Sequence, residues 1–265
     1  MIVTWLYVPG DRPERFAKAA ASGADVVIID LEDAVAPDGK DAARENTLAY
    51  LAAREAGGPA VHVRVNDLAT PRGRDDVGAL AGSGVDGVRV PKVEAPDVLD
   101  LLGDLPGYAL LESARGVLAA SAIAAHPNVA GIALGEQDLA AELSITAESA
   151  MDHLRLQVVL AAAAAGLPQV PMSVYPDVRD KAGLLASSAR GRSIGLYGRA
   201  AIHPRQLPVI REAFRPGEQE IARAREVVAL AGQGASALPD GRFVDAPVIA
   251  RARQVLRLAG EEIEI

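Results

Sequence analysis

Near its N-terminus the chain contains the segment Asp25-Val-Val-Ile-Ile-Asp-Leu-Glu-Asp-Ala-Val35. Val26 to Ile29 is a run of β-branched residues, which is typical of a strand buried on both faces of a parallel sheet. Asp30, Glu32 and Asp33 follow where that strand must end. Three acids this close repel one another unless a cation, a basic group or shared protons offset them. A solvated turn before a helix N-terminus, where acids are common, is the plain alternative.

The same pattern of a buried strand followed by polar residues recurs along the chain. The predicted strands are Val3–Val8, Val26–Ile29, Ala60–Val65, Gly87–Val90, Tyr108–Leu111, Val129–Leu134, Gln169–Val174 and Ser193–Tyr197. Eight strand–helix alternations in roughly 200 residues predict a (β/α)8 TIM barrel. An open doubly wound sheet is the alternative, but no Gly-x-Gly-x-x-Gly follows any of these strands.

After about residue 214 the pattern changes. Helices are predicted over Pro216–Ala231 and Ala246–Ala259, joined by the small-residue loop Gly232–Asp240. We therefore expect a catalytic barrel domain over 1–214. A C-terminal helical extension over 215–265 would pack on the barrel or on a neighbouring subunit.

Composition excludes several classes of function. The net charge is −8, from 27 basic and 35 acidic residues, which argues against a general nucleic-acid binder. There is no cysteine, so disulfides, thiolate metal sites and a cysteine nucleophile are excluded. No secretion signal is visible, and the longest uncharged run, Leu156–Pro176, is broken by glycine and prolines. We expect a cytoplasmic protein without a membrane partner.

In a barrel, catalytic groups lie at the carboxyl ends of the strands. The polar residues at the predicted ends are Asp11, Asp30, Glu32, Asp33, Arg64, Asn66, Lys92, Glu112, Glu136, Asp138 and His203. Acids outnumber bases and no histidine pair has ligand spacing, so oxygen ligation of Mg2+ or Mn2+ is favoured over zinc. Arg64 has the planar fork that suits a substrate carboxylate.

Each of these residues also has a structural alternative. Glu112 could be a helix cap and Asp138 could open a helical turn. Lys92 could simply pair with a neighbouring acid, and His203, before Pro204, could be a structural hydrogen-bonding residue.

Eight short segments together resemble the citrate lyase beta-subunit-like proteins, which belong with the HpcH/HpaI aldolases and the malyl-CoA lyases. They occur in the family order over nearly the whole chain. They are Leu6-Tyr-Val-Pro-Gly-Asp11, Ile29-Asp-Leu-Glu-Asp-Ala-Val35, Val63-Arg-Val-Asn66, Val90-Pro-Lys-Val93, Leu111-Glu-Ser-Ala-Arg-Gly116, Gly135-Glu-Gln-Asp-Leu139, Ala201-Ile-His-Pro204 and Phe243-Val-Asp-Ala-Pro247.

The resemblance implies a role for each strand-end residue. Glu112 and Asp138 would hold Mg2+, with Mn2+ as a possible substitute, and Glu112 would also contact the substrate. Glu32 and Asp33 would hold metal-bound waters, and Arg64 would grip the carboxylate of a 2-oxo acid.

The resemblance also implies a residue from a second subunit. The counterpart of Asp245 enters the neighbouring subunit's site on a mobile C-terminal segment and acts as the acid or base on the acyl α-carbon. Gly232 to Gly241 would supply that mobility. A homo-oligomer follows, and a homotrimer is favoured because trimers are common among such proteins.

The implied reaction is a Mg2+-dependent, reversible Claisen-type cleavage of a β-hydroxyacyl-CoA into an acyl-CoA and a 2-oxo acid, with CoA as part of the substrate. Three alternatives stay open: a malyl-CoA-type thioesterase, a CoA-free 2-oxo-acid aldolase, and a citryl-thioester lyase subunit of a citrate lyase complex. The chain departs from the family at Thr4-Trp5, where relatives commonly carry a basic residue associated with CoA.

Overall fold

The computed structural model describes residues 2–230, 236–237 and 241–261. Contacts within the chain divide it into two compact units, which meet between Ala213 and Phe214. The first unit contains the sheet and every predicted strand-end residue. No helix of the described residues is long and apolar enough to cross a membrane.

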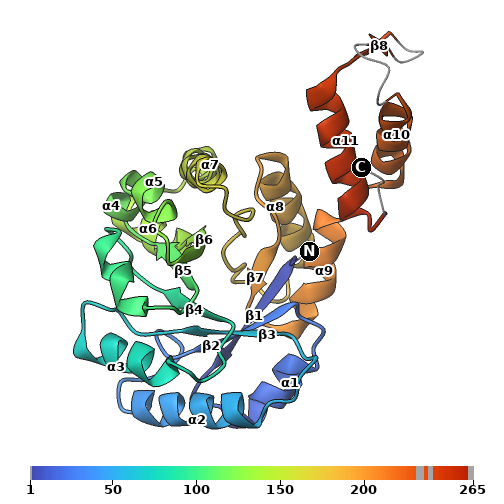
Figure 1. Cartoon of the computed structure of the whole chain (residues 1–265). Helices are drawn as coiled ribbons and strands as arrows, with labels where there is room; N and C mark the ends of the chain where they lie inside the picture. The colour runs from blue at the N-terminus through green and yellow to red at the C-terminus, as the bar shows by residue number, and fades with distance from the viewer. Residues whose placement is uncertain (1, 231–235, 238–240, 262–265) are drawn as a thin grey trace. The chain divides into compact units, whose positions relative to one another are not determined.

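The first unit is an α/β structure built on a parallel sheet of seven strands (Figure 1). The strands are β1 (Thr4–Pro9), β2 (Val26–Asp30), β3 (Ala60–Arg64), β4 (Gly87–Val90), β5 (Gly107–Leu111), β6 (Val129–Leu134) and β7 (Arg199–Ala201). Their order is β6-β5-β4-β3-β2-β1-β7, so chain neighbours from β1 to β6 are also neighbours in space. Because all are parallel, their carboxyl ends meet at one edge of the sheet. The predicted parallel α/β class is confirmed.

The predicted seventh strand forms only an isolated pairing. Met172 bridges Arg199 of β7 in the parallel sense. The Met172 N–H donates to the Gly198 carbonyl at 3.0 Å, and the Ala200 N–H donates to the Met172 carbonyl at 3.0 Å. The chain around Met172 therefore runs beside β7 without forming a regular strand.

The predicted start of the last strand, at Ser193–Tyr197, is wrong. Ser193 ends helix α8 (Lys181–Ser193), and the strand begins at Arg199. Gly195 and Gly198 lie between them with φ values of 97° and 77°. Left-handed backbone at two glycines makes a turn where the apolar pattern predicted a strand.

Helices lie around the outer side of the sheet (Figure 1). They are η1 (Pro13–Arg15), α1 (Phe16–Ala20), α2 (Lys40–Ala53), α3 (Pro71–Leu80), η2 (Asp97–Leu102), α4 (Ala114–Leu118), α5 (Ala120–Ala124), α6 (Glu136–Leu143), α7 (Glu148–Ala164), α8, η3 (Pro204–Gln206) and α9 (Leu207–Phe214). Local sequence fixes where several begin. The Thr70 hydroxyl accepts from the Gly73 N–H at the start of α3, and the Ser113 hydroxyl caps α4 in the same way.

The core is aliphatic, as the scarcity of aromatic residues indicates. Val26, Val27, Ile28 and Ile29 of β2 are each 0% exposed. Alternate β2 residues, Val26 and Ile28, pack in one cluster with Trp5. Strand β2 is therefore buried on both faces, as its β-branched run predicts.

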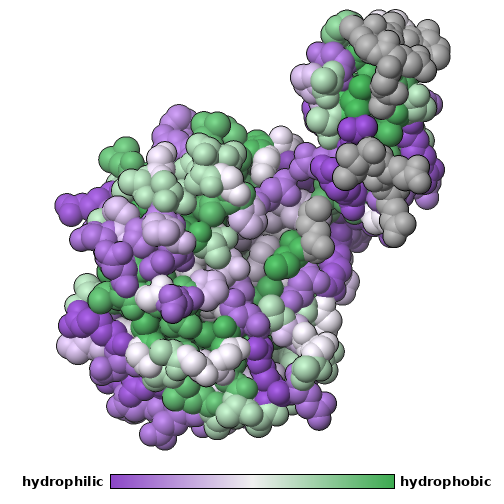
Figure 2. Space-filling view, in the orientation of Figure 1, coloured by the Kyte–Doolittle hydropathy of each residue, from purple (hydrophilic) through white to green (hydrophobic). Residues whose placement is uncertain are grey.

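Hydrophobic residues also reach the surface of the first unit. Figure 2 shows them gathered over α5 and α7 on the face in view. On α7, Leu156 is 42% exposed and Leu160 is 69% exposed. Helix α7 is thus apolar on its outer side as well as toward the core.

The second unit has a small core of its own. Helices α10 (Glu218–Ala229) and α11 (Ala246–Leu258) accompany an antiparallel pair, β8 (Ser236–Ala237) and β9 (Phe243–Val244). Val227, Val244 and Leu256 are among its buried residues. Both predicted helices are present, while most of the predicted loop Gly232–Asp240 lies outside the described residues.

Asp25 ties together the N-terminal ends of β1 and β2. One carboxylate oxygen accepts from the Val3 N–H at 2.9 Å and from the Thr4 N–H and hydroxyl at 2.8 Å. The other oxygen accepts from Arg211 of α9 at 2.9 Å. Burial alone would raise the pKa of Asp25, but these hydrogen bonds outweigh it and hold the pKa below its ordinary value.

Asp25→Asn should therefore lower the free energy of unfolding by about 1 kcal/mol near neutral pH. A lowered folded-state pKa stabilises the protein fully above the unfolded Asp pKa of about 3.9, and the effect is lost as the pH falls through the folded pKa. Urea denaturation over a falling pH series measures it, with exposed Asp97→Asn as the control. A difference that widens toward acid pH would contradict this account.

Candidate metal and substrate site

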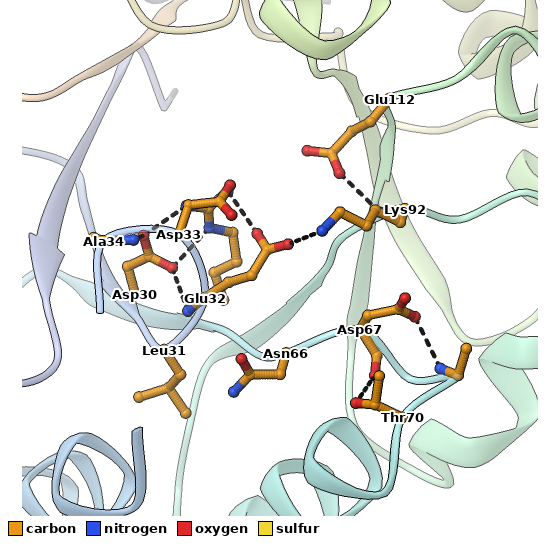
Figure 3. A network of polar contacts seen from close by, with 12 residues as sticks. Asp30, Leu31, Glu32, Asp33, Ala34, Asn66, Asp67, Thr70, Lys92 and Glu112 are labelled. Carbon is orange, nitrogen blue, oxygen red and sulfur yellow. Dashed lines mark hydrogen bonds and ion pairs between the residues drawn. The ribbon is translucent and has the colours of Figure 1, made fainter. Parts of the chain in front are cut away.

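The loop after β2 is held by two buried or partly buried groups. Asp30 ends the strand, and its carboxylate accepts the backbone N–H groups of Glu32 at 2.9 Å and Ala34 at 3.2 Å. From α2, the Lys40 ammonium donates to the carbonyls of Leu31 and Glu32 at 2.9 and 2.8 Å. The hydrogen bonds of Asp30 and Lys40 therefore fix the loop that carries the acids, and Figure 3 shows those of Asp30.

Arg64, the last residue of β3, offsets these acids. Asp30 is its register partner, and the two form a bidentate pair, with Nε–Oδ1 at 2.7 Å and Nη2–Oδ2 at 2.6 Å. The third nitrogen, Nη1, lies 2.9 Å from Glu32 and 3.3 Å from Asp33. Burial alone would lower the pKa of Arg64, but the hydrogen bonds and charge of Asp30 outweigh it and raise the pKa. The predicted need for a basic partner is thus met by Arg64.

Lys92 links two of the acids. Its ammonium lies 2.9 Å from a Glu32 carboxylate oxygen, and its backbone N–H donates to Glu112 at 2.9 Å (Figure 3). Lys92 has a φ of 54°, which is unfavourable for a residue with a side chain. In this conformation the N–H of Lys92 reaches Glu112 while its ammonium reaches Glu32. Burial raises the pKa of Glu32, against the opposing charges of Arg64 and Lys92.

Of the acids predicted at the strand ends, Glu112 and Asp138 are the two without a cationic partner. No ion pair joins either to a basic side chain within the described ranges. Burial raises the pKa of Glu112 to about 7, with the negative charges of Glu32 and Asp138 adding to it. The Glu112 side chain packs against the backbone of Gly135, which only glycine allows, because a Cβ at that position would lie 2.4 Å from the Glu112 side chain.

This donor set fits a divalent cation. Carboxylate oxygens are the ligands that Mg2+ prefers, and a cation would offset the burial and the neighbouring negative charges that raise the pKa of Glu112. Glu136, a further strand-end acid, is withdrawn, because it forms a buried pair with Arg155. In the part of the chain that the structure describes, no three acidic or histidine side chains form a ready-made metal site. Glu112 and Asp138 would thus leave most coordination positions to water or substrate.

Two cavities meet at these residues. One, of about 400 Å3, is lined on the inner side of the sheet by Tyr7, Arg64 and Arg89 together with Glu112 and Asp138. The other, of about 520 Å3, lies toward Lys92 and Ser113 and is lined by the same two acids. A third cavity, of about 410 Å3 between α3 and η2, contains none of the charged cluster. The cation would thus lie between two spaces that a substrate can enter.

The structure brings together five of the six predicted site residues. Glu32, Asp33 and Arg64 form the paired cluster, and Glu112 and Asp138 line the adjoining cavities. The sixth residue, Asp245, lies in the second unit, where its carboxylate accepts the Val248 N–H at 3.1 Å as the N-cap of α11. Its catalytic role stays a prediction.

Two basic residues of the site, Lys40 and Arg89, are not among those that the sequence predicts. Lys40 looks like an ordinary first-turn residue of α2, and only the folded loop brings its ammonium to the Leu31 and Glu32 carbonyls. Arg89 lies within the short strand β4, whose residues are all buried. A basic residue in such an apolar strand was the sequence signal that could have indicated a site residue.

The model of the HpcH/HpaI aldolase/citrate lyase family matches residues 4–204. This chain belongs to that family. The predicted resemblance is confirmed, and with it the enzyme class, a carbon–carbon lyase of the aldolase and citrate lyase type.

Individual members of the family are similar over most of their length. A (3S)-malyl-CoA thioesterase from Cereibacter sphaeroides is 41% identical, over 91% of this chain and 88% of its own. A citrate lyase subunit beta-like protein from Mycobacterium tuberculosis is 39% identical, over 97% and 95%. The crystal structure of protein CitE from that organism, in complex with magnesium, acetoacetate and coenzyme A, has a TM-score of 0.88 and 37% identity, covering 98% of both chains.

Asp30→Ala should destabilise the fold far more than Asp33→Ala. Asp30 is the buried bidentate partner of Arg64, so its loss leaves two guanidinium nitrogens and the N–H groups of Glu32 and Ala34 without acceptors and costs about 3 kcal/mol or more. The Asp33 side chain is 64% exposed, and its loss should cost less than about 1 kcal/mol. Urea denaturation of both variants gives the comparison, and equal losses would refute the anchoring role of Asp30.

Proposed function

We propose that this protein catalyses the Mg2+-dependent, reversible cleavage of a β-hydroxyacyl-CoA into an acyl-CoA and a 2-oxo acid. The observation that carries the proposal is the pair Glu112 and Asp138, two acids without a cationic partner beside the paired Arg64 cluster. The structure of the M. tuberculosis relative with magnesium, acetoacetate and coenzyme A supports it. So does a citrate lyase beta subunit structure from M. tuberculosis with oxaloacetate and magnesium, 37% identical with a TM-score of 0.74.

Glu112 and Asp138 would hold the cation, and Glu32 and Asp33 would hold water around it. Bound Mg2+ supplies a Lewis acid that lowers the pKa of the substrate hydroxyl and stabilises the oxo group formed on cleavage. Glu112 would also contact the substrate. Burial raises its pKa to about 7, and a cation bound beside it would favour the carboxylate form that acts as a ligand.

Arg64 would orient the 2-oxo acid through its carboxylate. Asp30 holds the Nε and Nη2 edge of the guanidinium, so the side chain cannot swing away. The remaining nitrogen, Nη1, points to Glu32 and to Asp33, and Asp33 lines the cavity. A fixed guanidinium converts binding into orientation of the reacting carbon.

Asp245 would act on the acyl carbon. Cleavage releases a thioester enolate, and a carboxylic acid can protonate its α-carbon. We propose that Asp245 does so from a neighbouring subunit, which requires a homo-oligomer, with a trimer favoured. The absence of cysteine suits a cytoplasmic location.

We also propose that residues 1–214 form a complete (β/α)8 barrel and that 215–265 form its C-terminal extension. The chain around Met172 would form the eighth strand of the barrel, between β7 and β6. Its hydrogen bonds to Gly198 and Ala200 support this place beside β7.

Thioester hydrolysis is the second candidate function. The similarity to a (3S)-malyl-CoA thioesterase, at 41% identity, favours it. Hydrolysis would give free CoA and a hydroxy acid, whereas cleavage gives an acyl-CoA and a 2-oxo acid. The two reactions are therefore distinguished by their products.

The test is a mass-spectrometric assay of the purified protein with Mg2+, an acyl-CoA (acetyl- or propionyl-CoA) and a 2-oxo acid (glyoxylate, pyruvate or oxaloacetate). A new hydroxyacyl-CoA that disappears with EDTA is the expected result. Asp138→Asn should reduce its formation at least about 100-fold, since the loss of a ligand removes the metal's contribution. Glu142→Gln, an exposed acid on the same helix, is the control. Product formation that ignores EDTA and Asp138→Asn would overturn the proposal.

Asp245→Asn should abolish turnover without loss of structure, because asparagine also caps a helix well. Mixing Asp245→Asn subunits with Asp138→Asn subunits should restore part of the activity if each site draws on two chains. Exchange of the acyl-CoA α-hydrogen with deuterium, followed by mass spectrometry, reports the proton transfer itself. Undiminished exchange in Asp245→Asn would exclude this residue as the acid.

A further inference from the structure

Arg89 of β4 is a buried cation without a partner. Arg89 is only 3% exposed, and its Nε has no hydrogen-bond acceptor. No ion pair or hydrogen bond joins its side chain to any residue in the described part of the chain. The guanidinium lies 5.9 Å from the Trp5 ring centroid and 5.5 Å from that of Tyr108. Such contacts offset only part of the cost of burying a charge.

The other buried arginines are satisfied by the protein. Arg155 pairs with Glu136, and Arg199 donates to the Ser173 carbonyl at 2.9 Å and to the Ser188 hydroxyl at 3.0 Å. Burial lowers the pKa of Arg89, and the like charge of Arg64 lowers it further. No carboxylate opposes this lowering of the Arg89 pKa, so Arg89 differs from Arg155 and Arg199.

Arg89 faces the same cavity as the candidate site. The cavity of about 400 Å3 is lined by Arg89, Arg64, Glu112 and Asp138. Arg64 and Arg89 are register partners on adjacent strands, which lie about 4.8 Å apart. Three acids already offset Arg64, whereas Arg89 meets the same space with its charge uncompensated.

We propose that Arg89 binds a second carboxylate of the substrate, so that the oxo acid taken by this site is a short 2-oxo diacid. The inference rests on the proposed function, in which Arg64 receives the carboxylate next to the oxo group. Two guanidinium groups on neighbouring strands match the two ends of a short diacid. A monoacid would leave the charge of Arg89 buried and unpaired.

Trp5 gives a direct readout of binding, since it is the only tryptophan of the chain and its ring lies against Arg89. Its fluorescence would be followed during titration, with Mg2+ present, by oxaloacetate or by 2-oxobutyrate, which has a methyl group in place of the second carboxylate. Oxaloacetate should bind at least about 10-fold more tightly, the weight of a charged hydrogen bond. Arg89→Met should remove most of this preference and Arg89→Lys should keep part of it. Arg15→Met, an exposed arginine, should leave it unchanged.

Equal binding of the two acids, or a preference that survives Arg89→Met, would overturn the proposal. If Arg89→Met does not fold, Arg89→Lys decides, because an unreduced preference there would be just as contrary. The lyase assay is scored separately. No product together with an Arg89-dependent preference would refute the proposed reaction and keep the diacid site, and product formation without that preference would do the reverse.

Discussion

The bidentate pair of Arg64 and Asp30 is the interaction on which the site depends. It joins the ends of two adjacent strands, and both carboxylate oxygens of Asp30 also hold the backbone of the following loop. The loop therefore cannot move without breaking a buried ion pair, which is costly to leave half-made. Glu32 and Asp33 take their places around the guanidinium because of this constraint.

The pair also divides the acids at the carboxyl ends of the strands into two groups. Asp30, Glu32 and Asp33 share Arg64, and Glu32 gains Lys92 as well. Glu112 and Asp138 receive no such cation, and burial together with the negative charges of Glu32 and Asp138 raises the pKa of Glu112. The strand-end acids thus divide into three that pair with Arg64 and two, Glu112 and Asp138, that pair with no cation in the described part of the chain.

Much of this could be predicted from the sequence, because local pattern determined it. The β-branched run of β2 predicts a strand buried on both faces, and parallel strands must bring their polar ends to one edge. The last strand could not be placed, because Gly195 and Gly198 turn the chain and glycine fits either state. Which acid would pair with Arg64, and that Arg89 would face a cavity without an acid, depend on contacts between distant segments. Sequence spacing does not encode those contacts.

Binding of Mn2+ in place of Mg2+, followed by electron paramagnetic resonance of the free ion, tests the central claim most directly. It needs neither substrate nor turnover. The account predicts a single bound ion per chain that Mg2+ displaces and that Glu112→Gln weakens at least about 10-fold. A wild-type protein that binds no Mn2+, or a Glu112→Gln variant that binds it as tightly as the wild type, would contradict it.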